Sequence, residues 1–213
     1  MPELCTPDFS LLHPVELQGW GVRLVPLEAT HAQGLAAAAE EDAQWQFALT
    51  WIPAPDDVPR YIAHALAMQQ QGLRQPFAVL DATSGRVLGT SSYHDIVPAA
   101  ARLEIGHTWY ARSAQRSHVN TACKFLLMQH AFESLHCAVV GWRTDSLNTR
   151  SQQAIERLGA RKDGVLRHHA VRHDGSVRDT VMYSMLASEW TYAKTRLLEK
   201  LELLTLDVSH LQS

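Results

Sequence analysis

The chain has 213 residues, a formal net charge of −3 and three cysteines, Cys5, Cys123 and Cys137. This length suits one domain or two, and a hydrophobic share of 46% excludes a wholly disordered chain. The balanced charge argues against a non-specific nucleic-acid binder, which needs an excess of lysine and arginine. The cysteines have no CxxC spacing, and no stretch approaches the ~20 apolar residues of a membrane span. We therefore expect a cytoplasmic protein with no membrane segment, disulfide framework or zinc site.

After a leader at residues 1–17, strand and helix patterns alternate along the chain. Thr30 to Gln33 has the form of a capping box, Asp174-Gly175 is a strong hairpin turn, and Gly159 ends a short helical pattern. The expected elements are a strand at 19–26, a helix after Thr30, a helix at 56–71, strands at 76–81, 87–93 and 101–110, a helix at 120–135, a strand at 137–143, a helix at 148–158, strands at 165–171 and 177–186, and a helix at 188–204.

This order predicts an α/β (α+β mixed) fold, in which one sheet of about seven strands has helices on both faces. No break in composition divides the chain, so we expect one domain at residues 18–190, followed by a helix and tail at 191–213. The last helix carries an apolar stripe. The stripe predicts either a homodimer interface or packing of the helix on its own domain. The stripe consists of Trp190, Leu197, Leu198, Leu201 and Leu204.

The most informative stretch runs from Leu103 to Thr121, where a strand enters a polar loop and the loop opens a helix near Asn120. Backbone N–H groups at a helix start, together with the helix dipole, favour an anion such as phosphate. Arg112, Arg116 and Lys124 would add positive charge. The alternative is an ordinary capped helix on the surface.

This stretch resembles the phosphate loop of the GNAT superfamily of acyl-CoA-dependent N-acetyltransferases, which has the form Q/R-x-x-G-x-G/A. Gln115 matches the first position, while His118 and Asn120 stand at the two glycine positions. His118 could crowd a pyrophosphate or donate a hydrogen bond to it. Residues 119–135 and 148–159 are similar to the RimJ/RimL-type branch, which acetylates ribosomal-protein N-termini. Further matches in the last third are Gly164 to Arg167, Asp174-Gly175, Arg178-Asp179, Tyr183-Ser184 and Glu189-Trp190.

The resemblance covers roughly residues 18–190 and implies a single GNAT-like domain with a mixed, mostly antiparallel sheet. It also implies acetyl-CoA as the acyl donor, with its pantetheine arm along the strand that ends at Tyr110 and its phosphates at the loop. The residues that the resemblance assigns to acetyl-CoA are Thr108, Trp109, Tyr110, Gln115, Arg116, Ser117, His118, Val119, Asn120, Thr121, Lys124 and Asn148.

Two catalytic residues are implied by the same resemblance. Glu104 stands where many GNAT enzymes keep a glutamate base, and strand alternation predicts that it shares a face with Gly106, Thr108 and Tyr110. The alternative for Glu104 is an ion pair with an arginine across the sheet. Ile155 stands where many relatives have a tyrosine acid, so Ser151 is the expected proton donor to the leaving thiolate. Asn148 is also a good N-cap in its own right.

The acceptor groove is expected between the first inter-helix segment and the last hairpin. Trp45 and Trp51 could form an acceptor wall or could be core residues, and Arg167 belongs to the basic hairpin. A metal site is not expected there, because His168 and His169 are adjacent on a strand and point to opposite faces.

Together these features predict an N-acetyltransferase that moves an acetyl group from acetyl-CoA directly to a primary amine, on a protein N-terminus or a small molecule. No metal, nucleic-acid or membrane partner is expected, and a homodimer is possible. The alternative is a non-catalytic acyl-CoA-binding or protein-interaction module on the same fold.

Overall fold

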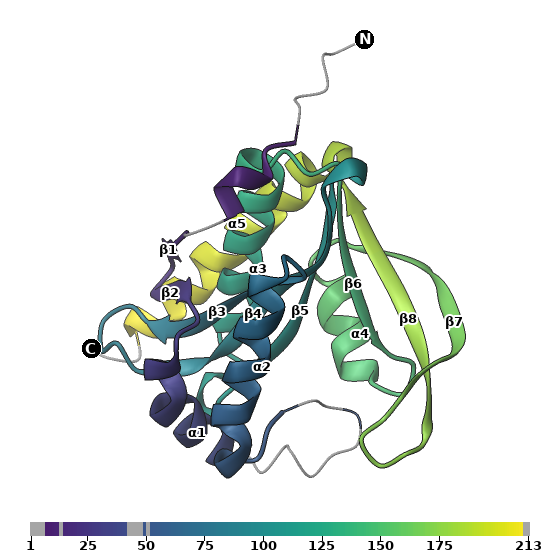
Figure 1. The fold of residues 1–213 in the computed structure, drawn as a ribbon. Coiled ribbons are helices and arrows are strands. Elements are labelled where there is room, and N and C mark those ends of the chain that lie inside the picture. The colour runs from purple at the N-terminus through teal and green to yellow at the C-terminus, as the bar shows by residue number, and fades with distance from the viewer. Residues whose placement is uncertain (1–6, 13–14, 42–48, 50–51, 211–213) are drawn as a thin grey trace.

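In the computed structural model, which describes residues 7–12, 15–41, 49 and 52–210, one sheet lies between two helical layers (Figure 1). The helices are α1 (Ala32–Glu40), α2 (Val58–Gln70), α3 (Val119–Gln129), α4 (Thr149–Glu156) and α5 (Ala187–His210). The strands are β1 (Leu17–Gly19), β2 (Val22–Pro26), β3 (Arg74–Asp81), β4 (Val87–Val97), β5 (Arg102–Tyr110), β6 (Val139–Asp145), β7 (Arg161–Val171) and β8 (Val177–Leu186).

The sheet has the strand order β1-β2-β3-β4-β5-β6-β8-β7. Every neighbouring pair is antiparallel except β5 and β6, which run parallel. The predicted mixed, mostly antiparallel fold is therefore confirmed, with eight strands rather than about seven. The extra strand is β1, which begins at the end of the predicted leader, before most of the strand predicted at 19–26. Trp20 and Gly21, with positive φ angles of 47° and 72°, turn the chain so that β1 pairs with β2 in a tight hairpin.

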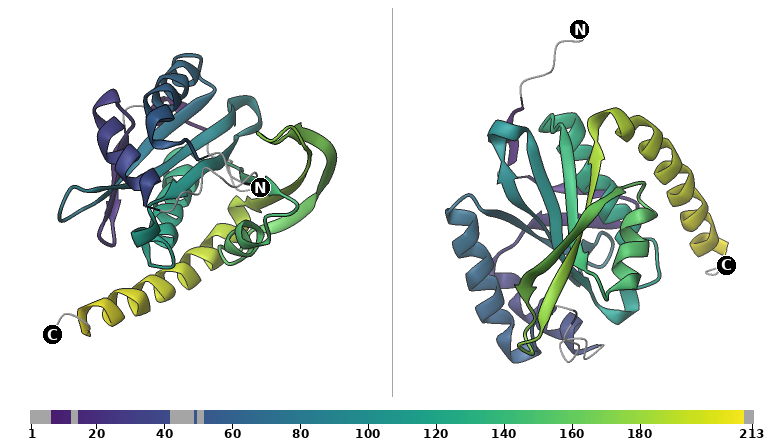
Figure 2. Two further views of the ribbon diagram at one scale, coloured as in Figure 1. Left: turned by 90° about the horizontal axis from the view of Figure 1, so that it is seen from below. Right: turned by 90° about the vertical axis from the view of Figure 1, so that its right-hand side faces the viewer.

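Helices cover both faces of the sheet, as Figure 2 shows from two further directions. The larger buried cluster joins the sheet to α3, α4 and α5 and includes Phe125, Trp142 and Leu197. The smaller one joins the sheet to α1 and α2 and includes Leu35 and Ile62. Almost every residue of α3 is buried, since this helix lies between the sheet and α5.

The apolar stripe of α5 packs on its own domain. The Trp190 ring stacks on Phe132 at a centroid distance of 5.4 Å, and Leu197 and Leu201 are buried. This is the second of the two arrangements expected from the sequence, and the homodimer remains a prediction. Within the part of the chain that the structure describes, no helix has the length and apolar character needed to cross a bilayer.

Candidate active site

The parallel pair β5 and β6 opens into a gap. Only Arg102, Leu103 and Glu104 of β5 pair with β6, opposite residues 139–141. Beyond Glu104, β5 continues to Tyr110 with no partner on this side among the described residues, and the two strands diverge (Figure 1). The free backbone groups on this edge of β5 can pair with an extended ligand as a further strand would.

A β-bulge lies on β5 beside this gap. Thr90 pairs with Trp109 and Ser92 with Gly106, so Ser91 alone opposes both His107 and Thr108. His107 has a φ of 48°, which is the left-handed conformation that such an extra residue can adopt. The bulge turns one backbone unit out of the ladder at the middle of the free edge.

The bulge also changes which side chains share a face, and this corrects the sequence analysis. Leu103 and Ile105 face α3, so Glu104 and Gly106 face the other side of the sheet. After the bulge the alternation is reversed: Thr108 bonds to α3 and Trp109 lies in the cluster under α1 and α2. Thr108 and Tyr110 therefore do not share a face with Glu104, because one extra residue shifts the period-2 pattern by one.

Lys124 is buried beneath this bulge. Its Nζ donates to Thr108 Oγ1 at 2.6 Å and to Ser91 Oγ at 3.2 Å, which links β4 and β5. Burial lowers the pKa of Lys124 to about 7. Lys124 lies more than one turn inside α3 and faces the sheet rather than the predicted phosphate loop, and its role toward the cofactor remains a prediction.

The predicted phosphate loop ends at the start of α3. Arg116 has a φ of 56°, and Ser117 Oγ donates to Ala114 O at 2.6 Å and accepts from Val119 N at 3.2 Å. The first turn of α3 leaves further N–H groups without helical partners, which suits an anion. His118 has an ordinary φ of −66°, so its backbone does not require glycine. Its ring is directed toward Gly21, with Nε2 3.6 Å from the place of a Cβ there.

The start of α4 lies beside the same loop. Arg150 donates from Nη2 to Gln115 Oε1 at 2.7 Å, and Gln115 donates from Nε2 to Tyr110 O at 3.1 Å. Asn148 caps α4, because its Oδ1 accepts from Ser151 N at 3.0 Å. The cap expected for Asn148 is thus observed, while its cofactor role and the proton-donor role of Ser151 remain predictions. Sequence reasoning missed Arg150, which lies inside the matched segment 148–159 but far from the loop in sequence.

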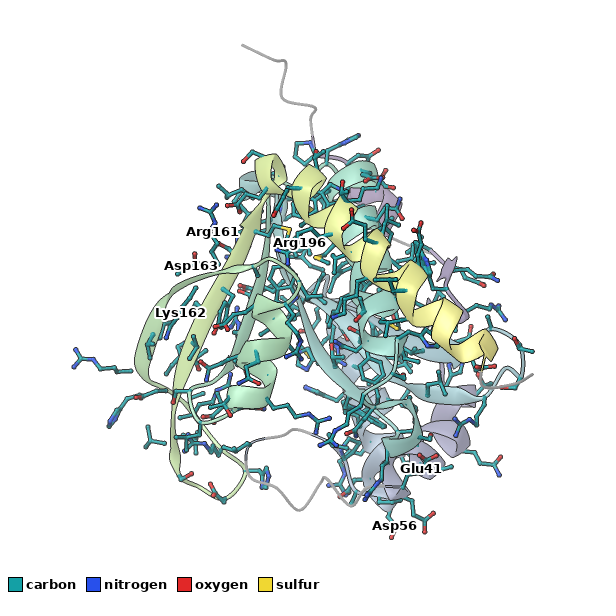
Figure 3. The ribbon with its side chains drawn as sticks, turned by 180° about the vertical axis from the view of Figure 1, so that it is seen from behind. Glu41, Asp56, Arg161, Lys162, Asp163 and Arg196 are labelled. Atoms are coloured by element: carbon teal, nitrogen blue, oxygen red, sulfur yellow. The ribbon has the colours of Figure 1, made fainter. Side chains whose placement is uncertain are left out.

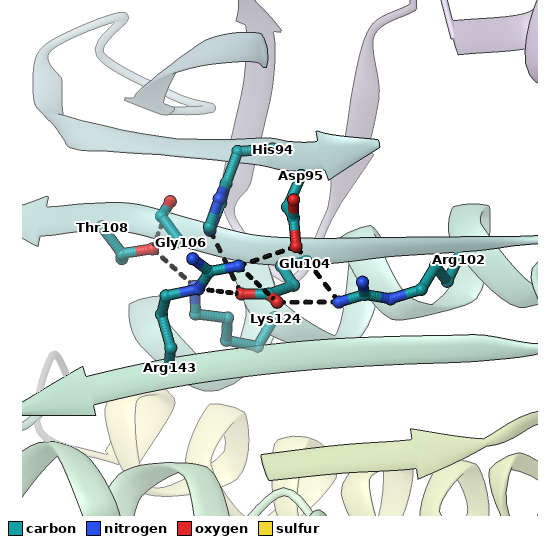
Figure 4. A network of polar contacts seen from close by, with 8 residues as sticks. All are labelled: His94, Asp95, Arg102, Glu104, Gly106, Thr108, Lys124 and Arg143. Atoms are coloured by element: carbon teal, nitrogen blue, oxygen red, sulfur yellow. Dashed lines mark hydrogen bonds and ion pairs between the residues drawn. The ribbon is translucent and has the colours of Figure 1, made fainter. Parts of the chain in front are cut away.

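At the closed end of the gap, Glu104 is the centre of an ion-pair network (Figure 4). Arg143 donates to it from Nε at 2.6 Å and from Nη2 at 2.7 Å, and Arg102 donates from Nη2 at 2.9 Å. Asp95 accepts from the same two arginines, at 2.7 Å and 3.2 Å. The Glu104 side chain is 0% exposed. This is the cross-sheet ion pair that was the alternative for Glu104, and both of its carboxylate oxygens accept hydrogen bonds from guanidinium groups.

Two neighbours complete the closed end of the gap. A side chain on Gly141 would bring its Cβ to 2.9 Å from Glu104 Cγ, so the glycine gives the carboxylate its space. His94 Nε2 lies 3.9 Å from Glu104 Oε2. Burial, with a further contribution from the Arg143 charge, lowers the pKa of His94 to about 3, so this ring is neutral near pH 7.

The β7–β8 hairpin forms the far side of the gap. Arg172 makes a two-bonded ion pair with Asp145 at the end of β6, at 2.6 Å and 2.9 Å. Arg167 lies exposed on β7, the outermost strand. Figure 3 shows the opposite side of the molecule, where Arg161 and Lys162 lie along the same outer strand. Trp45 and Trp51, the other expected groove residues, lie outside the described residues. No metal-binding group of His, Cys, Asp and Glu occurs in the described part of the chain.

A family model described as an acetyltransferase (GNAT) domain matches residues 22–161, which is more than half of the chain. The chain belongs to the GNAT acetyltransferase family. This confirms the resemblance found in the sequence, and members of this family transfer an acyl group from acetyl-CoA. No curated protein matches the sequence.

Solved structures agree with this assignment. A GCN5-related N-acetyltransferase from Brucella melitensis is 30% identical, with 92% of this chain and 87% of that chain covered and a TM-score of 0.79. Mycobacterium smegmatis RimJ in complex with CoA-disulfide is 20% identical, with 89% and 96% covered and a TM-score of 0.75. RimL, a ribosomal L7/L12 α-N-protein acetyltransferase in complex with coenzyme A, is 15% identical, with 81% and 98% covered and a TM-score of 0.69. The last two comparisons show the fold alone.

The free edge of β5, the start of α3 and the start of α4 lie beside one another and carry many of the expected donor-site residues, with Arg116 and Arg150 exposed beside the loop. These features fit an extended arm that ends in phosphates. Glu104 and Lys124 are both buried. Glu104 joins β5 to β6, and Lys124 joins α3 to β5 and β4.

Proposed function

We propose that this GNAT protein is an N-acetyltransferase that moves an acetyl group directly from acetyl-CoA to a primary amine. The acceptor is an α-amine at a protein N-terminus or an amine of a small molecule. The observation that carries the proposal is the gap between β5 and β6, with a bulge on its free edge and a helix N-terminus with arginines at its mouth. The proposal needs no acyl-enzyme, and the two cysteines in the described part of the chain, Cys123 and Cys137, are buried, which raises the pKa of each thiol to about 12.

Each part of the site has a role in this proposal. The edge of β5 holds the pantetheine arm, and a backbone N–H at the bulge, near Thr108, polarises the acyl carbonyl. The loop at 115–121 binds the phosphates, with Arg116 and Arg150 adding charge. Glu104 fixes the closed end of the gap through Arg143, and the amine loses its proton to water rather than to a free carboxylate. Ser151 donates a proton to the leaving thiolate.

The first test is a thermal-shift titration with acetyl-CoA, with CoA and dephospho-CoA beside it. At a ligand concentration 100 times Kd, binding adds about 2.7 kcal/mol to the free energy of unfolding. For a domain of this size we expect Tm to rise by roughly 5–10 °C. An amine panel that releases free thiol then supports the enzyme. Binding without thiol release supports the non-catalytic acyl-CoA-binding alternative, and no shift at millimolar ligand contradicts both.

The proton-donor role of Ser151 gives a second prediction. Ser151→Ala should lower kcat on the order of 100-fold, since general acid catalysis typically contributes this much. The Kd for acetyl-CoA and the α4 cap should persist, because Asn148 bonds to the backbone N of Ser151 and not to its hydroxyl. Single-turnover thiol release measures the effect, and Ser151→Thr, which keeps a hydroxyl, is the matched control. An unchanged kcat in the alanine variant would remove Ser151 from the mechanism.

A further inference from the structure

Arginines outnumber carboxylates on the face of β5, β6 and β8 that points away from α3. This is the face that carries Glu104 and Arg143, and it lies between α2 and the β7–β8 hairpin. Four guanidinium groups meet three carboxylates on or beside these strands, which gives 4 − 3 = +1 for this set, and Asp174 and Asp179 of the hairpin also lie near Arg172. The groups are Arg102, Arg143, Arg172 and Arg178 against Asp95, Glu104 and Asp145.

The three carboxylates are already engaged. Glu104 and Asp95 are bonded to Arg102 and Arg143 as described above. Asp145 is 3% exposed, accepts two hydrogen bonds from Arg172, and accepts a third from Leu147 N at 2.9 Å. No carboxylate in this group is left to neutralise a fourth guanidinium.

Of these four arginines, Arg178 is the one for which the described part of the chain supplies no ion pair. It lies on β8 two residues before Thr180, which pairs with Asp145, so its side chain is on the same face as Asp145 and Arg143. Its Nε is buried without a hydrogen-bond partner, and among the described residues no ion pair joins it. Burial lowers the pKa of Arg178, and the neighbouring charges of Arg143 and Arg172 oppose the stabilising charge of Asp145. A half-buried guanidinium in this setting gains from a carboxylate supplied from outside.

We propose that Arg178 binds a carboxylate of the acceptor, so that the preferred acceptors are primary amines with an acidic group close to the amine. The proposal rests on the function proposed above and names its substrate class. In the sheet order β8 lies two strands from β5, so Arg178 stands across the gap from the free edge where acyl transfer is proposed. An acidic side chain near the start of an extended N-terminus can reach across the gap while the terminal amine stays at that edge. The carboxylate of a free amino acid offers the same chemistry at closer range.

The cationic face also acts on the amine itself. Nearby positive charge disfavours an ammonium and lowers the pKa of a bound amine. A negative group on the acceptor therefore brings it to this face, while the arginines help to keep its amine neutral and nucleophilic. Both effects favour amine acceptors that carry a carboxylate over acceptors with several positive charges.

The test compares three peptides that differ only at the second residue, Ser-Asp, Ser-Asn and Ser-Lys, each amidated at its C-terminus. For the native protein, kcat/KM from thiol release should be about 10- to 100-fold higher for Ser-Asp than for Ser-Asn, and lowest for Ser-Lys. Arg178→Met should remove this preference, and Arg178→Glu should favour Ser-Lys. Arg196→Met, which changes an exposed arginine of α5 on the far side (Figure 3), should leave the ratios unchanged. Serine against serinamide distinguishes a free α-carboxylate from an acidic side chain.

A binding readout keeps the inference separate from the proposed enzyme activity. With CoA present, the Ser-Asp peptide should raise the Tm of the native protein and not that of Arg178→Met. Equal rates and equal shifts for Ser-Asp and Ser-Asn in the native protein would overturn the acidic-acceptor inference while leaving N-acetylation intact. If no amine acceptor leads to release of thiol from acetyl-CoA, but the Tm shift caused by Ser-Asp depends on Arg178, the proposed carboxylate-binding site is supported and the proposed enzyme activity is contradicted.

Discussion

Replacing Arg143 with alanine should lower the free energy of unfolding by about 3–5 kcal/mol. The variant removes two of the three hydrogen bonds that Glu104 accepts from arginines, and the carboxylate is completely buried. A buried charge that loses its main partner keeps its full desolvation cost, so the loss exceeds that of any surface ion pair. Urea unfolding at pH 7 measures the change.

A matched control for this variant is Arg23→Ala. Arg23 binds Glu16 at 2.7 Å, a distance similar to that of the Arg143 contacts, but both side chains are partly exposed. Exposed pairs of this kind contribute about 0–1 kcal/mol. Equal losses in the two variants would show that the Glu104–Arg143 contact does not hold β5 to β6. In the double variant Arg143→Ala with Glu104→Gln, the loss should be smaller than for Arg143→Ala alone.

Lys124→Met should change how stability depends on pH. The pKa of Lys124 is about 7 in the folded chain and 10.5 in the unfolded chain, so the unfolded state binds more protons between these values. The native protein therefore bears the full cost of the buried ammonium below pH 7 and loses that cost as the pH rises toward 10.5. Between pH 7 and pH 10 its free energy of unfolding should rise by roughly 3 kcal/mol relative to the variant.

Urea unfolding of both proteins at several pH values between 7 and 10 measures this difference, and the comparison cancels the titration of groups that do not interact with Lys124. Lys162→Met is the matched control, because Lys162 lies exposed on β7. Its stability curve should run parallel to that of the native protein. Parallel curves for Lys124→Met as well would mean that the Lys124 ammonium is not desolvated in the folded chain.

The elements around the site could be predicted from local patterns. The strand ending at Tyr110, the helix after the polar loop and the cap at Asn148 all have residues that specify them locally. The bulge could not, since its left-handed residue is His107 rather than a glycine, and it arises because β5 has one more residue than β4 between the pairs Thr90–Trp109 and Ser92–Gly106. The faces predicted for Thr108 and Tyr110 were wrong for this reason.

Ion pairs between residues far apart in sequence were the other feature that the sequence could not predict. Glu104 and Arg143 are 39 residues apart, and their contact requires both the parallel pairing of β5 with β6 and the absence of a side chain at Gly141. Lys124 looked like a phosphate ligand because it is close to the loop in sequence. Its position inside α3, between buried residues, directs it to the sheet instead. The sequence therefore identified the family and the loop but could not assign the partners of buried charges.

Because β5 and β6 pair over only a short length, the eight-stranded sheet consists of two antiparallel halves joined by one short parallel pairing. Strands β1 to β5 form one ladder and β6 to β8 form the other. Strand pairing joins them at three residue pairs only, together with the ion pairs of Arg143 to Glu104 and Asp95. Bending at that junction would widen or narrow the gap while leaving the hydrogen bonds of both ladders in place. A molecule that forms hydrogen bonds to both β5 and β6 across the gap would take the place of the strand pairing that is absent there. It would thereby connect the two halves of the sheet. Its contribution to rigidity is then spread over the whole domain and extends well beyond the residues that it touches.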